Sequence, residues 1–326
     1  MINTIRVRIV TKSSLLPTMT CDDFFHSADF FAMIEKTPRM SPYMAVAEDG
    51  NGKVVAHMLA SISYHGAAIP PIVYSIGRVY GEGEYCEGTD QEAVFSKMLK
   101  AITKEFRQKL CLYAEFSHVS TKMFGYKHFR RNGYFPIQWQ EIHNSLHSQP
   151  PANRLSEKTK NKIDAALKRG ASSQLLSGEA ELESFYKLLK NYFRFKSRRS
   201  IPSIEMFRMV GKSGNGKIFV TKYKDKIIGG CVCLFSQENA YLWFLAAKRK
   251  SFITLHPDTL TVWEAINYAY RNSIKHFYFL DAGLPFSKSP IREFILRFGG
   301  KPVATYRWFK LPIPLMNKLL SWLYND

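Results

Sequence analysis

The pattern of hydrophobic and polar residues along the chain predicts the same order of strands and helices twice. In the first series, alternating segments predict strands at residues 43–49, 53–64, 71–81, 110–116 and 135–146. Helical spacing predicts two helices among them, at residues 90–106 and 120–134. The first helix carries one apolar face, formed by Val94, Met98, Ile102 and Phe106. The order is three strands, a helix, a strand, a helix and a strand.

The second series repeats this order. Strands are predicted at residues 217–223, 226–235, 239–247, 276–282 and 301–311, and helices at 258–272 and 289–300. We expect the first of these helices to bury Leu260, Trp263, Ile266 and Tyr270. The repeated order indicates an internal duplication.

A break in composition separates the two series. Pro150 and Pro151 lie in a polar run, and two further helices are predicted after it, at residues 156–170 and 179–200. We therefore predict a domain at residues 1–149 and a second domain at 150–326 that begins with two extra basic helices.

Charge distinguishes the two halves. Of a net charge of +19, residues 1–150 contribute 16 Lys and Arg against 14 Asp and Glu, whereas residues 151–326 contribute 30 against 13. We expect the second half to meet any anionic ligand. The five cysteines show no paired metal-ligand spacing, so neither a metal nor a tightly bound cofactor is predicted. The sequence shows no signal-peptide or membrane-spanning pattern, which indicates a cytoplasmic protein, either free or peripheral to the inner membrane.

One loop concentrates cations between a strand and a helix. Lys248, Arg249 and Lys250 follow the strand at 239–247, and Thr259 lies in the first turn of the next helix. The start of a helix favours anions, which makes these residues candidates for binding phosphate. The alternative is a solvated basic loop.

Three stretches carry a resemblance to a known family. They are "RLSEKTKNKIDAALKRG", "FRRNGYFPIQWQEI" and "FLDAGLPFSKSPIREFILRFGGKPVATY". With the order of elements, they resemble the acyl-CoA N-acyltransferase (GNAT) fold, and two copies in one chain resemble the FemABX family of peptidoglycan aminoacyltransferases. The resemblance implies an α/β (α+β) fold of two tandem GNAT-like domains, each with a mixed, mostly antiparallel sheet flanked by helices.

The resemblance also implies roles for particular residues. The residues that the resemblance implies for donor binding are Lys248, Arg249, Lys250 and Thr259. Asp281 is the candidate that orients or deprotonates the amine, Glu82 and Glu84 are candidates at the acceptor site, and the proton donor stays open between Ser287, Ser289 and water. Backbone N–H groups where residues 241–247 separate from the neighbouring strand are expected to bind the oxyanion. For acceptor phosphate the resemblance implies Lys36, and Arg292 or alternatively Arg297. The dense cations Arg194, Arg198 and Arg199 are further candidates for acceptor phosphate, with ordinary favourable charge at a helix C-terminus as the alternative. The sequence departs from the family at Ile295, where Fem proteins carry a lysine, and it lacks a glycine-rich pyrophosphate loop.

The expected function is that of an N-acyltransferase. It would move an acyl or aminoacyl group from acyl-CoA or aminoacyl-tRNA, as a co-substrate, to an amine of a cell-envelope precursor of the peptidoglycan type. The alternative is a non-catalytic basic module that binds nucleic acid or an anionic envelope polymer. The C-terminal segment 306–326 is apolar and basic, and we expect it to pack on its domain, with peripheral membrane contact as the alternative.

Overall fold

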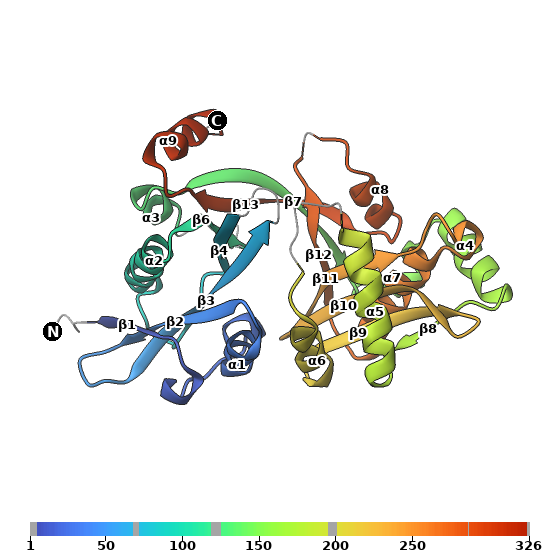
Figure 1. Cartoon of the computed structure of the whole chain (residues 1–326), viewed down its shortest axis with the longest axis horizontal. Helices are drawn as coiled ribbons and strands as arrows, with labels where there is room; N and C mark the ends of the chain where they lie inside the picture. Colours follow the sequence, from blue (N-terminus) through green and yellow to red (C-terminus); the bar gives the residue numbers. More distant parts are fainter. Residues whose placement is uncertain (1–4, 68–71, 119–124, 195–200, 286, 325–326) are drawn as a thin grey trace. The chain divides into compact units, whose positions relative to one another are not determined.

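The computed structural model describes residues 5–67, 72–118, 125–194, 201–285 and 287–324. It divides into two compact units, residues 1–139 with 305–326 (unit 1) and residues 140–304 (unit 2), whose elements are labelled in Figure 1. The division follows two strands that pass from one unit to the other, β7 (Phe135–Ser145) and β13 (Lys301–Lys310). The domain boundary that the sequence predicts between residues 149 and 150 separates the two repeated halves of the sequence, and it stays a prediction.

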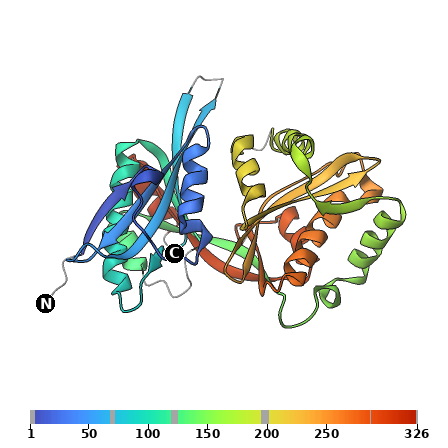
Figure 2. The ribbon, with the colours of Figure 1, turned by 90° about the horizontal axis from the view of Figure 1, so that it is seen from below.

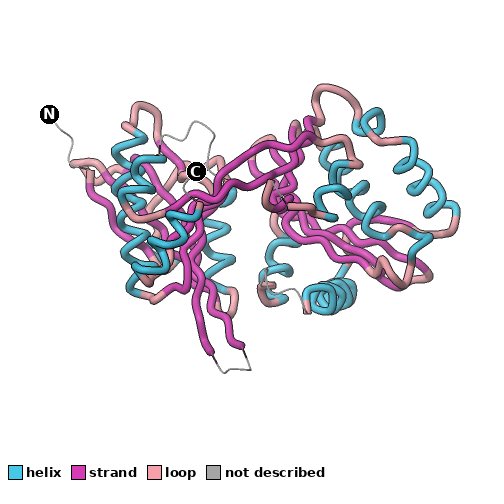
Figure 3. Tube along the Cα trace, turned by 90° about the horizontal axis from the view of Figure 1, so that it is seen from above, coloured by secondary structure: helices cyan, strands magenta, loops and turns pink. Residues whose placement is uncertain are grey.

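Unit 1 contains a mixed sheet in the order β1-β2-β3-β4-β6-β13. Its other strands are β1 (Arg6–Val10), β2 (Met40–Glu48), β3 (Val54–Ala67), β4 (Ile72–Tyr80), the short β5 (Glu84–Tyr85) beside β3, and β6 (Cys111–Ser117). Only β4 and β6 pair in parallel; the remaining pairs with known register are antiparallel. Figure 3 shows β3 and β4 projecting together beyond the helices of this unit.

The helices of unit 1 are α1 (Ala28–Lys36), α2 (Gln91–Gln108), α3 (Tyr126–Arg131) and α9 (Pro314–Leu323). Asp90 caps α2 by accepting the Ala93 N–H at 3.1 Å, and the predicted face of Val94, Met98, Ile102 and Phe106 is buried. Figure 2 shows α1 and α2 on opposite sides of the sheet. Both faces of the central strands are therefore covered.

Unit 2 contains a second mixed sheet, in the order β7-β12-β11-β10-β9-β8. Its further strands are β8 (Ser172–Leu175), β9 (Gly216–Tyr223), β10 (Lys226–Ser236), β11 (Asn239–Ala247) and β12 (His276–Gly283). Its helices are α4 (Glu157–Lys168), α5 (Gly178–Phe193), α6 (Ile204–Lys212), α7 (Pro257–Arg271) and α8 (Pro290–Leu296). The mixed, mostly antiparallel sheet predicted for each copy is confirmed.

Two adjacent glycines bring helices close to both faces of β10. A Cβ on Gly229 would lie 2.9 Å from the Pro257 carbonyl oxygen of α7, and a Cβ on Gly230 would lie 2.5 Å from the Phe185 ring of α5. Because successive strand residues point to opposite faces, α7 and α5 cover opposite sides of the sheet. The first turn of α7 therefore sits directly on β10.

The burial predicted for α7 is partly wrong. Leu260 and Ile266 are buried as predicted, together with Val262, Ala265 and Ala269, but Trp263 is only partly buried and Tyr270 is 41% exposed. The packing expected of the C-terminal segment holds for its first part, where Trp308 of β13 is buried in the core of unit 1 and stacks on Phe129, whereas the terminal helix α9 buries no residue. The sequence prediction also gave no bounds for six short elements, which are β1, β5, β8, α1, α6 and α9.

Candidate functional site

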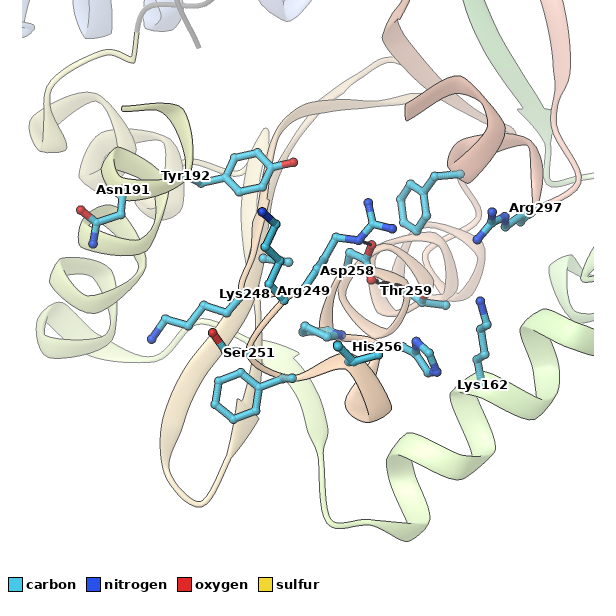
Figure 4. A pocket seen from close by; sticks show the side chains of 16 residues that line it. Lys162, Asn191, Tyr192, Lys248, Arg249, Ser251, His256, Asp258, Thr259 and Arg297 are labelled. Carbon is cyan, nitrogen blue, oxygen red and sulfur yellow. Dashed lines mark hydrogen bonds and ion pairs between the residues drawn. The ribbon is translucent and has the colours of Figure 1, made fainter. Parts of the chain in front are cut away.

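The cation-bearing loop after β11 borders a cavity of about 890 Å³ in unit 2. Its walls come from the end of β11, the first turn of α7, and side chains of α4 and α5 (Figure 4). All four predicted donor-binding residues, Lys248, Arg249, Lys250 and Thr259, line it. The structure therefore brings this predicted set together, while the role of the set stays a prediction.

The backbone of the loop is fixed at both ends. The Lys248 N–H donates to the Ile228 carbonyl at 2.8 Å, and the Phe252 N–H donates to the Lys248 carbonyl at 3.1 Å. His256 then adopts a left-handed conformation (φ 40°, ψ 53°), which is uncommon for a residue with a side chain. Pro257 follows as the first helical residue, where its missing N–H costs nothing.

An acidic residue already occupies the start of α7. The buried Asp258 carboxylate accepts the Thr259 N–H at 2.9 Å and pairs with the Arg249 guanidinium at 2.8 Å. The charge at the helix N-terminus is therefore partly neutralised within the protein. Side-chain cations must supply most of the attraction for an anionic ligand.

Five cations line the cavity against the single carboxylate of Asp258. They are Lys162, Lys248, Arg249, Lys250 and Arg297. Apart from Arg249, none of them forms an ion pair within the part of the chain that the structure describes. Burial, and then the charge of Arg297, lower the pKa of Lys162. This unbalanced positive charge favours a ligand with more than one phosphate.

A smaller pocket of about 370 Å³ adjoins the cavity and shares several of its residues. Leu245, Pro290, Ile291 and Phe294 give it an apolar lining, and Tyr192 of α5 and Arg249 border both spaces. In Figure 4 the Tyr192 ring extends from α5 toward the cavity. A ligand that occupied both spaces would combine an anionic end with a less polar arm.

The two pockets meet where β11 leaves its neighbour. Within the described residues, the parallel ladder of β11 with β12 ends at Leu242 and Phe279, although β11 continues to Ala247. The Lys248 N–H donates to β10, and alternate residues of a strand point their N–H groups to opposite edges. The N–H groups of Leu245 and Ala247 therefore face away from β10. Both residues line the pockets, which makes these two N–H groups candidates for binding an oxyanion.

Arg297, the alternative to Arg292 in the sequence analysis, lines this cavity. The sequence analysis missed three other residues of the lining, which come from α4, α5 and α8: Lys162, Tyr192 and Phe294. They lie far from the loop in the sequence, and no local spacing marks them. The basic character of α4 was the only available signal for Lys162.

The residues predicted around α8 have local roles. Ser289 caps α8 by accepting the Arg292 N–H at 3.3 Å, and the Arg292 guanidinium donates to the carbonyls of Leu284 and Ser287. Arg292 is absent from the described lining of the cavity, where Arg297 lies instead. Asp281 belongs to β12, and the position of its side chain is outside the description.

The predicted acidic site lies in unit 1. Glu84 accepts the Asp23 N–H at 2.9 Å, and burial, followed by the charge of Asp23, raises the pKa of Glu84. Glu84 lines a pocket of about 170 Å³ with His57, whereas Glu82 accepts the Tyr85 hydroxyl through its carbonyl at 2.6 Å. A carboxyl group with a raised pKa suits acid–base chemistry, so Glu84 stays a candidate.

His57 predicts a loss of stability in acid. Burial lowers its pKa to about 4. The imidazole of His57 therefore binds a proton more readily in the unfolded chain than in the folded protein. Above pH ~6.5 the stabilisation from neutral His57 is fully present, and as the pH falls toward 4 the free energy of unfolding decreases by about 3 kcal/mol at most. Urea unfolding of the protein at pH 7 and at pH 4.5 should show this loss, and His57→Gln should reduce it. An unchanged loss in His57→Gln would contradict the assignment.

The residues predicted to bind acceptor phosphate belong to both units. Lys36 is exposed at the end of α1 in unit 1, and Arg194 is exposed at the end of α5 in unit 2. Arg198 and Arg199 lie outside the described residues. The phosphate role of this set therefore stays a prediction.

Comparisons with known proteins agree with this geometry. Residues 156–288 match a family model described as an acetyltransferase (GNAT) domain. The fold of the chain is similar to that of FemX (TM-score 0.62, 11% identity, 93% of this chain and 95% of that one). It is also similar to L-PGS from Bacillus licheniformis (0.59, 11%, 91% and 92%) and to a tandem GNAT protein from the clavulanic acid biosynthesis pathway (0.58, 11%, 95% and 99%). No curated protein matches the chain by sequence.

None of the helices in the described ranges is long and apolar enough to cross a membrane.

The family match ends before α8 and covers the cation-bearing loop, the first turn of α7 and the end of β11. The structural likeness extends over both units. The chain therefore has a tandem GNAT fold, and residues 156–288 of its unit 2 match the model of an acetyltransferase (GNAT) domain.

Proposed function

We propose that the protein is an N-acyltransferase that uses a phosphate-bearing acyl donor, either acyl-CoA or aminoacyl-tRNA. The acceptor is an amine of a cell-envelope precursor of the peptidoglycan type. The observation that carries the proposal is the cationic cavity of unit 2, which adjoins an apolar pocket at the point where β11 and β12 part. The cations would hold the phosphates, and the apolar pocket would receive the arm that ends in the reactive carbonyl.

The reaction joins the amine nitrogen to the carbonyl carbon of the donor. A C–N bond forms, and the C–S bond of a thioester, or the C–O bond of an aminoacyl ester, breaks. The N–H group of either Leu245 or Ala247 donates to the oxyanion of the tetrahedral intermediate, because N–H groups two residues apart on a strand are about 6.6 Å from each other, too far to share one oxygen. Asp281 accepts the proton that the attacking amine loses, and the leaving sulfur or oxygen must gain one.

Tyr192 is the proposed donor of that second proton. It borders both the cationic cavity and the apolar pocket, where the leaving atom of a bound donor would lie. Tyr192 comes from α5, which lies between β8 and β9 in the chain and far from α8, so the segment around α8 gave no sign of it. Solvent restores the phenol after each turnover.

Tyr192→Phe is expected to lower kcat by about 100-fold, because a positioned general acid contributes on that scale, and to change donor affinity little. Tyr186→Phe is the matched control, since Tyr186 lies on the same helix and donates its hydroxyl to the Pro202 carbonyl at 3.1 Å. Single-turnover kinetics with a labelled donor would measure both variants. A Tyr192→Phe protein with unchanged kcat would remove Tyr192 from the mechanism.

The proposal is tested by incubating the protein with radiolabelled acetyl-CoA, or with aminoacyl-tRNA, and an amine-bearing envelope precursor. Mass spectrometry should detect the new amide, and Asp281→Asn should abolish its formation with little change in donor binding. Binding that falls steeply with salt, without product from either donor, would instead support the non-catalytic basic module.

A further inference from the structure

A second cationic cavity lies in unit 1, and most of its basic residues come from the first 150 residues, whose net charge is only +2. Six basic residues line its volume of about 570 Å³: Lys97, Lys100, Lys104, Arg107, Arg131 and Lys310. Four of them form one stripe of α2, because helical spacing places every third or fourth residue on the same face. Among the described residues that line it, none is acidic. This arrangement differs from that of the cationic cavity of unit 2, called the donor cavity below, where Asp258 offsets part of the positive charge.

The charge of this cavity is not balanced inside the protein. Throughout the described ranges, none of the six basic side chains forms an ion pair. Lys97 donates to the Ile5 carbonyl at 3.0 Å and Lys310 donates to the Asn132 carbonyl, so these two are held in place by uncharged acceptors. Burial, and then the charge of Arg107, lower the pKa of Lys310. The cavity therefore offers a preformed site for negative charge.

An exposed apolar helix borders the same cavity. The Asn317 side chain of α9 accepts the Leu311 N–H at 2.8 Å and donates to the Gly133 carbonyl at 2.9 Å, beside the cavity residue Asn132. These bonds fix α9 on unit 1 by polar contacts, while its apolar side chains face solvent. Exposure is 79% for Leu315, 60% for Leu319 and 75% for Trp322.

We infer that this part of unit 1 docks on an anionic lipid bilayer, with phosphate headgroups at the cationic cavity and α9 in the headgroup–acyl boundary. Leucine and tryptophan beside lysine and arginine is the composition of interfacial helices. Nucleic acid would satisfy the cations and leave the apolar side chains of α9 in water. A second copy of the chain would bring six like charges together. The inference goes beyond the proposed reaction, because it concerns binding and a different unit.

Cosedimentation with vesicles tests the inference without any measurement of transfer. The full-length protein is mixed with vesicles of phosphatidylcholine alone, or of equal parts phosphatidylcholine and phosphatidylglycerol, at about 0.1 M salt, where screening acts over about 10 Å. We expect binding to the anionic vesicles only. Equal binding to both, or to neither, would overturn the inference.

Two pairs of variants distinguish the effect of the cavity on vesicle binding from the effect of the overall charge of the protein. Lys100→Glu with Lys104→Glu should lower the vesicle partition coefficient by about 30-fold or more, since each basic residue near an anionic surface contributes about fivefold. Lys212→Glu with Lys226→Glu makes the same change in net charge at exposed positions of unit 2, and should lower it by less than about threefold. Equal losses in the two pairs would mean a general charge effect and no site.

A further pair tests α9. Leu319→Ser with Trp322→Ser should weaken vesicle binding by about tenfold or more, because both side chains would leave the acyl boundary. Val73→Ser with Leu110→Ser alters equally exposed apolar residues of unit 1 (80% and 78%) and should have no effect. Unchanged thermal midpoints would show that the variants fold. Retained vesicle binding in the α9 pair, or RNA that competes and binds independently of α9, would overturn the inference.

Discussion

Reversing two charges of the donor cavity, with Lys248→Glu and Lys250→Glu, is expected to weaken binding of a coenzyme A thioester by about 100-fold or more. Each lysine would lose a charge-assisted hydrogen bond to phosphate of about 1.5–3 kcal/mol, and each new carboxylate would repel the ligand. Both side chains are exposed on the cavity wall, so the fold should be unaffected. Isothermal titration calorimetry would measure the change.

The matched control is again Lys212→Glu with Lys226→Glu, which alters net charge equally outside the cavity. Affinity should also fall with salt more steeply in the unsubstituted protein than in the cavity variant, because fewer ionic contacts remain in the variant. If the control pair weakened binding as much as the cavity pair, the ligand would be responding to the charge of the whole unit.

Gly300→Ala is expected to destabilise unit 2 by about 3 kcal/mol or more, through steric overlap that the packing cannot relieve. A Cβ at this position would lie 1.9 Å from the Asn144 side-chain oxygen and 2.5 Å from the Ile142 Cγ2 of β7. The Asn144 amide cannot simply rotate away, since it donates to the Phe298 carbonyl at 3.1 Å. The second glycine of "FGG" is therefore required by close packing.

Gly214→Ala serves as the control, because a Cβ there would meet no atom within 4 Å. Its effect on stability should be within about 0.5 kcal/mol. Urea unfolding followed by circular dichroism would compare the two variants. Similar midpoints for both would contradict the packing account of this motif.

The strands and helices of unit 2 could be predicted closely from the sequence, because each has a strong period and clear ends. β11 was predicted at 239–247 and forms at Asn239–Ala247. The error at Tyr270 arose because α7 packs its small residues Ala265 and Ala269 against the sheet, and small residues weaken a periodicity count. Short elements such as β8 and α6 carry too few residues for a period to emerge.

The candidate site could be predicted only where its residues are neighbours in the sequence. The loop that holds Lys248 to Lys250 is one such stretch, whereas Lys162, Tyr192 and Arg297 reach the cavity through tertiary packing. The basic cavity of unit 1 escaped prediction for a related reason. Five of its six cations belong to the first half, where acidic residues nearly equal basic ones in number, and the fold brings Lys310 of the second half beside them.

The most direct test of the proposed donor site is the thermal midpoint of the purified protein with and without excess coenzyme A thioester at low salt. Ligand at about 100 times its dissociation constant adds about 2.7 kcal/mol, which predicts a rise of several degrees that Lys248→Glu with Lys250→Glu removes. No rise with the thioester, and none with aminoacyl-tRNA in a parallel experiment, would contradict the assignment of this cavity to an acyl donor.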